Sequence, residues 1–95
     1  FATIVTAERT HAASIATLLT NRSWAVPASQ WTTSNVPAFA SVQAACAAGA
    51  AAEQDNIELY DKYLALPLPA DVLRVFQNNR RASLENHLPA FERCR

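Results

Sequence analysis

Several kinds of functional site are excluded by what this 95-residue sequence lacks. Its single glycine leaves no glycine-rich loop for a phosphate, and it has no Gly-x-Ser-x-Gly motif for a nucleophilic serine. Eight basic residues balance eight acidic ones, so no basic surface for nucleic acid or an anionic membrane is expected. No apolar run approaches the roughly 20 residues that span a bilayer. The absence of methionine and the start at Phe1 lead us to expect a processed or truncated product.

The scarcity of glycine, the abundance of alanine and the lack of β-branched alternation predict one all-α domain. Apolar periodicity predicts three helices, from Thr3 to Arg22, from Ser34 or Asn35 to Leu66, and from Ala70 to Arg93. The Pro-Leu-Pro turn at 67–69 should make the last two antiparallel neighbours. The long connection at 23–34 can cross the height of a bundle, and we expect Trp24 and Trp31 to hold it against the helices.

Polar residues occupy positions of each helix that the apolar period assigns to the interior. Glu8 and His11 lie three apart in the series Ile4, Glu8, His11, Ile15, Leu18, so they share the apolar face of the first helix. The second helix places Glu53 and Asn56 inside, and the third places Arg80, Ser83 or Leu84, and His87. Pro89 should kink the third helix just past His87, because it removes the bond to the carbonyl of Glu85.

The register of the last two helices predicts which of these residues meet. In an antiparallel pair, residues at one height have residue numbers that add to a nearly constant total. Glu53 with His87 and Cys46 with Cys94 share the same total, so one register would bring both pairs together. The two cysteines are therefore either a disulfide or two buried thiols.

Carboxylates and imidazoles on facing helices suit a transition metal, with iron or manganese favoured and zinc as a further choice. The predicted ligands are Glu8, His11, Glu53 and His87, with Asn56 and Arg80 around them. The alternative is a buried ion-pair network in which Arg80 and protonated histidine balance the two glutamates.

Three segments resemble the ferritin-like DUF2202 family of bacteria and archaea. They are residues 1–11 (FATIVTAERTH), 49–57 (GAAAEQDNI) and 86–91 (NHLPAF). The resemblance implies a four-helix bundle in which Glu8 and His11 form a Glu-x-x-His motif, Glu53 is a single glutamate ligand and His87 is the histidine of the last helix. The sequence departs from the pattern at Leu84, where a glutamate is expected, and at Asn56, where an aspartate is expected. A mononuclear or asymmetric site is therefore expected rather than a symmetric di-iron centre.

The resemblance also implies that the chain begins at the second helix of the bundle. We therefore expect an upstream helix or a second copy of the chain to fill the missing place. The leading hypothesis is a ferritin-like metal-binding bundle with an oxidoreductase or metal-handling role. The alternatives are a non-enzymatic oligomeric bundle with structural polar residues, and a carrier of small apolar ligands that uses Trp24, Trp31, Tyr60 and Tyr63. A secreted or periplasmic location is favoured if Cys46 and Cys94 form a disulfide.

Overall fold

The chain folds into helices only, as predicted. In the computed structural model, which describes all 95 residues, the elements are α1 (Ala2–Asn21), α2 (Val42–Leu64), α3 (Ala70–Ala82), the π-helical turn η1 (Ser83–His87) and α4 (Leu88–Glu92). No strand is present. None of the helices is both long and apolar enough to cross a membrane.

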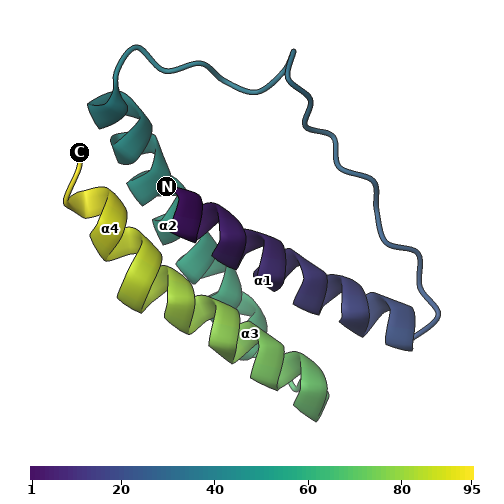
Figure 1. The fold of residues 1–95 in the computed structure, drawn as a ribbon. Helices are drawn as coiled ribbons and strands as arrows, with labels where there is room; N and C mark the ends of the chain where they lie inside the picture. The colour runs from purple at the N-terminus through teal and green to yellow at the C-terminus, as the bar shows by residue number, and fades with distance from the viewer.

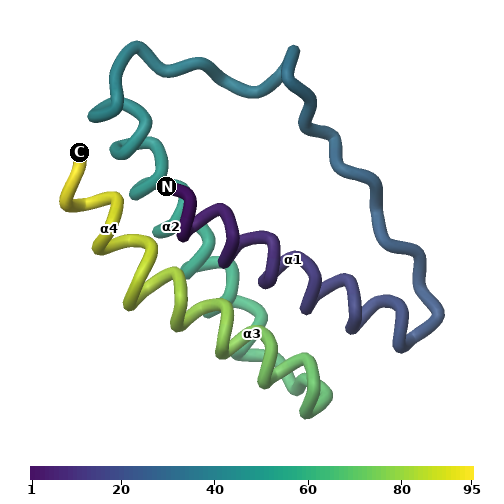
Figure 2. Tube along the Cα trace, viewed as in Figure 1, coloured from purple at the N-terminus to yellow at the C-terminus, as the bar shows by residue number.

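The helices form three rods (Figure 1). The elements α3, η1 and α4 continue one another as a single rod, and this rod is antiparallel to α2 because only residues 65–69 separate them. The remaining rod, α1, packs against α3. Figure 2 shows residues 22–41 bowed away from the helices between the end of α1 and the start of α2. This arrangement contains the antiparallel pair and the long crossover that the sequence predicts.

The start of α2 differs from the prediction. The side chain of Asn35 stabilises a turn within the crossover, where its Oδ1 accepts a hydrogen bond from Thr32 N and its Nδ2 donates one to Gln30 O. The helix is capped instead by Ser41, whose Oγ accepts a hydrogen bond from the backbone N–H of Ala44. The predicted start at Ser34 or Asn35 is therefore wrong, and the irregular connection is longer than expected.

The tryptophans do not hold the crossover against the helices. Trp24 is 62% exposed and Trp31 is 67% exposed, and every residue from 23 to 40 is exposed. Trp24 only borders a small apolar crevice between α1 and α3. The prediction failed because a side chain in a long connection has no helical period to define which residue it contacts.

The interior is small and mostly polar. The buried apolar residues are Leu18, Cys46 and Ala50, whereas the buried polar residues are Glu53, Asn79, Ser83 and His87. Buried polar side chains cost free energy unless they find partners, so a polar majority in so small a core calls for a specific role.

An ion pair joins the end of α1 to the start of α3. Arg22 donates from Nη2 to Asp71 Oδ1 at 2.8 Å and from Nη1 to Asp71 Oδ2 at 3.1 Å, while Nη1 also donates to the carbonyl of Leu18. The hydrogen bonds from Arg22 lower the pKa of the Asp71 carboxyl, and the backbone N–H of Val72 acts in the same direction. This bidentate ion pair fixes how α1 lies against α3.

Asp71 should therefore make stability depend on pH in the acid range. Because its pKa is lower in the folded chain, its contribution is complete above the unfolded value of about 4 and is lost as the pH falls through the folded value. We expect Asp71→Asn to lower the melting temperature at pH 6 and to have a smaller effect at pH 2.5. Circular dichroism melting curves at the two pH values measure this, and an equal effect at both would contradict it.

Candidate metal centre

The register predicted for α2 and the following rod is confirmed. Cys46 and Cys94 form a disulfide with their Cα atoms 5.7 Å apart. Two turns along the same helices, Glu53 Oε1 lies 3.3 Å from His87 Nδ1. Of the two alternatives for the cysteines, the disulfide is the one present, and it is compatible with an extracellular location.

The turn that carries His87 is a π-helix rather than an α-helix. The backbone N–H of Leu88 donates to the carbonyl of Ser83, five residues earlier. Pro89 follows at once, and a proline ring clashes with the carbonyl four residues before it in a regular α-helix. The wider turn gives the ring room, so Pro89 produces a π-turn where the sequence predicts a kink.

The π-turn adds one residue to the register. On the α3 side of the turn, the two residue numbers of three contacting pairs add to the same total. These pairs are Asn56–Ser83, Tyr60–Asn79 and Tyr63–Phe76. On the α4 side of the turn, the residue numbers add to a total that is higher by one, in the pairs Glu53–His87 and Cys46–Cys94. The extra residue therefore sets His87 opposite Glu53 while the helices below remain in their own register.

The first helix supplies the other half of the centre. Glu8 places Oε1 2.8 Å from His87 Nδ1 and Oε2 3.5 Å from His11 Nδ1. The centroids of the two imidazole rings lie 5.5 Å apart, and the Glu8 carboxylate contacts Nδ1 of both rings. One ligand atom from each of Glu8, His11 and His87 can be chosen so that all three lie within 4.8 Å of one another, and Glu53 adjoins this group through His87. The four predicted ligands thus come together from three rods.

The contacts of His87 are not hydrogen bonds. The residue is 3% exposed, and Nδ1 lies close to both carboxylates, yet neither contact has the geometry of a hydrogen bond. Glu53 Oε2 is also buried without a partner. Bonds of about 2.1 Å at 90–110° separate the ligand atoms of one metal by roughly 3.0–3.4 Å. The 3.3 Å separation from Glu53 lies in this range, and the 2.8 Å separation from Glu8 is slightly shorter. The donor set and these unpaired atoms fit a bound cation.

No family model, curated protein or solved structure matches this chain. The function is therefore inferred from the geometry of the site.

The residues predicted to surround the ligands are only partly in place. Asn56 donates from Nδ2 to Ser83 Oγ at 3.1 Å, one turn from the centre. Ser83 is buried and Leu84 is 41% exposed, which settles the alternative in favour of Ser83. Arg80 is wrong as a site residue, because it donates to Asp61 at the surface and the buried position of that turn belongs to Asn79. A period of 3.6 residues allows either neighbour, so the pattern alone did not separate Asn79 from Arg80.

A second buried contact lies one turn farther along. Asn79 Nδ2 donates to Tyr60 Oη at 3.2 Å, and Asn79 Oδ1 has no partner. Burial raises the pKa of the Tyr60 phenol, the hydrogen bond from Asn79 opposes this, and the charges of Glu8 and Glu53 raise it further. Tyr60 therefore stays protonated at neutral pH on the side of the interior that faces the carboxylates.

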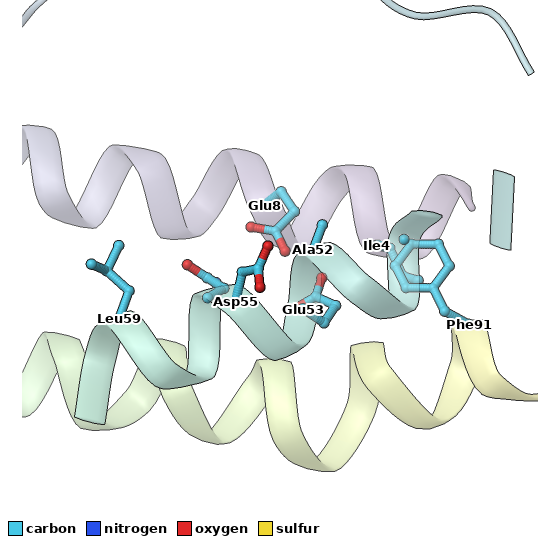
Figure 3. Close-up of a pocket in the computed structure, with 9 residues that line it drawn as sticks. Ile4, Glu8, Ala52, Glu53, Asp55, Leu59 and Phe91 are labelled. Carbon is cyan, nitrogen blue, oxygen red and sulfur yellow. The ribbon is translucent and has the colours of Figure 1, made fainter. Parts of the chain in front are cut away.

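The centre opens onto a groove between α1 and α2. Figure 3 shows Glu8 on α1 and Glu53 and Asp55 on α2 along this groove, with Ile4 and Phe91 at one end and Leu59 at the other. The groove is open to solvent and has a volume of about 530 Å³. The side chain of Glu8 is 44% exposed, whereas that of His87 is 4% exposed, so ions and solvent reach the centre from the Glu8 side. Sequence reasoning missed Asp55, because its position falls outside the interior period.

Proposed function

We propose that this chain is a ferritin-like helical bundle that binds a divalent transition metal ion, iron or manganese in the first instance and zinc as a further candidate. The observation that carries the proposal is the Glu8 carboxylate between His11 and His87, with Glu53 against the same buried nitrogen. Imidazole nitrogen combined with carboxylate oxygen is a donor set that these ions accept.

Charge balance favours the metal over a buried ion-pair network. The network needs cations to balance Glu8 and Glu53, and the sequence offered Arg80 and protonated histidine for this purpose. In the structure Arg80 pairs with Asp61 instead, so no guanidinium reaches the two glutamates. The network would therefore need both His11 and His87 to be protonated. A divalent ion would neutralise both carboxylates and leave the histidines neutral, the form in which they act as ligands.

The donor count favours one metal ion or an asymmetric pair. The residue that precedes His87 on the face toward α2 is Ser83 and not a carboxylate. Its Oγ accepts a hydrogen bond from Asn56. The site therefore lacks the second Glu-x-x-His motif of a symmetric centre. A bound ion would supply Lewis-acid or one-electron chemistry, which supports an oxidoreductase or metal-handling role. The chain's own contribution is to hold the ion between three rods and to leave the Glu8 side open.

The open groove and the disulfide each support one further part of the proposal. A second copy of the chain or an additional helix would cover Ile4 and Leu59 and complete the bundle. The disulfide supports a secreted or periplasmic setting, in which such a bond persists.

Metal binding is tested on protein that has been stripped with a chelator. We expect Mn²⁺, Fe²⁺ under anaerobic conditions, and Zn²⁺ each to bind at about one ion per chain and to raise the melting temperature. An ion present at a hundred times its Kd should stabilise the fold by about 2.7 kcal/mol. Mg²⁺ is the matched control, because it prefers oxygen ligands and should bind much more weakly. No calorimetric heat and no thermal shift with any of the three ions would reject the proposal.

The second candidate is a non-enzymatic oligomeric bundle whose buried polar residues set the register. The pairs Asn56–Ser83 and Tyr60–Asn79 favour it, since they fix the alignment of two helices without any cofactor. Under this alternative Glu8→Gln would change the assembly state measured by light scattering, and the purified protein would contain no metal.

A further inference from the structure

The disulfide and His87 lie on the same short segment of the chain. His87 ends the π-turn, α4 has only five residues, and Cys94 follows it within one turn. Cys46 and Glu53 lie at the matching heights of α2. Whatever fixes Cys94 therefore limits how the segment from 83 to 94 can rotate about its own axis.

The π-turn needs restraint from both sides, because the wider turn that Pro89 requires does not by itself fix the rotation of the helix beyond it. On the α3 side, Ser83 is held by the hydrogen bond from Asn56. On the α4 side, the disulfide is the only covalent restraint, and the Phe91 ring lies against Gly49, where a Cβ atom would come within 2.5–2.8 Å of the ring. His87 stays in the centre while both restraints hold the extra residue in place.

We propose that the Cys46–Cys94 disulfide is a redox latch on the metal centre: a dithiol reductant opens it, the helix beyond the π-turn becomes free to rotate, and His87 leaves Glu8 and Glu53. This inference rests on the proposed function and specifies how the same site is regulated. Without the disulfide, the segment beyond Pro89 is held on α2 only by the contact of Phe91 with Gly49, so it can rotate and carry His87 with it. His87 then no longer faces α1 and α2, and the metal loses its buried nitrogen ligand.

The chemistry of opening is thiol–disulfide exchange. Cys46 is fully buried, whereas Cys94 is partly exposed near the end of the chain, so the external thiolate attacks Sγ of Cys94. The S–S bond breaks, a mixed disulfide forms, and the electron pair and a proton go to Cys46. The second thiol of the reductant then displaces Cys94 and closes its own disulfide. Two electrons and two protons pass from the dithiol to the two cysteines.

The latch is tested at 10 °C on the oxidised chain, on the chain reduced with a dithiol, and on the Cys46→Ser/Cys94→Ser variant. The probe ion is Mn²⁺, because zinc would bind the freed thiolates. We expect Mn²⁺ affinity to fall at least tenfold in the reduced chain and equally in the double serine variant, with helical circular dichroism unchanged. Backbone exchange at the Leu88 amide, whose hydrogen bond defines the π-turn, should become faster while exchange at Ala16 in α1 stays the same.

Failure of the latch is distinguishable from failure of the proposed function. If the oxidised chain does not bind Mn²⁺, the proposed function fails, and the Leu88 amide still reports whether the turn responds to reduction. If the oxidised and reduced chains bind Mn²⁺ within twofold of each other and Leu88 exchanges at one rate, the latch is wrong. Loss of helical signal on reduction also overturns it, because the disulfide would then only hold the fold together.

Discussion

Replacing His87 by glutamine is expected to weaken Mn²⁺ binding at least about a hundredfold while the helices remain folded. His87 is the buried ligand against which both glutamates are placed, at 2.8 Å for Glu8 and 3.3 Å for Glu53. Changes to groups that only orient metal ligands already cost 10–100-fold in affinity, so the loss of a buried ligand should cost no less. A glutamine amide can still donate a hydrogen bond to Glu53, so the buried carboxylate does not lose its polar partner. Isothermal titration with Mn²⁺ measures the change.

The matched control for this substitution is Glu85→Gln. Glu85 lies in the same π-turn, but its side chain is exposed, and it belongs to none of the ion pairs of the centre. We expect Glu85→Gln to bind Mn²⁺ as the unaltered chain does. Equal affinities for the His87 and Glu85 variants would show that His87 is not a ligand.

Deleting Leu84 while Pro89 is kept should prevent the disulfide from forming. The deletion shortens the segment by one residue, whereas Pro89 still requires the wider turn before it. Everything beyond the turn then rotates by about 100° and moves about 1.5 Å relative to α2. Cys94 no longer faces Cys46, and His87 no longer faces Glu53. A thiol assay on the denatured, air-oxidised protein should find about two free thiols per chain.

The control for the deletion is the same deletion combined with Pro89→Ala, which lets the shortened segment form a regular α-helix. One residue fewer in the chain is then matched by one residue fewer in the turn, so Cys94 should face Cys46 again. This control should contain almost no free thiol. If the deletion variant oxidises as completely as the control, the π-turn does not set the register above it.

The sequence predicted the architecture well where the period of a regular helix was sufficient. The pairings of Glu53 with His87 and Cys46 with Cys94 were correct because seven residues separate the members on each helix, which is nearly two full turns. The all-α class, the antiparallel pair and the crossover followed from composition and from the prolines of the 67–69 turn. The approach of Glu8 and His11 to His87 followed from their place on the apolar face of the first helix.

The failures lie where the period is interrupted. The period could not show that Pro89 would widen the preceding turn, so the extra residue and the choice of Ser83 over Leu84 came only from the structure. Arg80 was assigned to the interior one position away from Asn79, since both fit a 3.6-residue repeat. The start of α2 was placed too early because Asn35 is a good helix cap by residue type but stabilises a turn in the crossover instead.

The most direct test of the metal centre is an anomalous difference map from crystals grown with Mn²⁺. The geometry predicts one peak among α1, α2 and η1, within bonding distance (roughly 2.0–2.3 Å) of the Glu8 carboxylate and His87 Nδ1 and beside His11 and Glu53. A map with no peak there at millimolar Mn²⁺, with Glu8 and His87 in a direct hydrogen bond, would contradict the proposal.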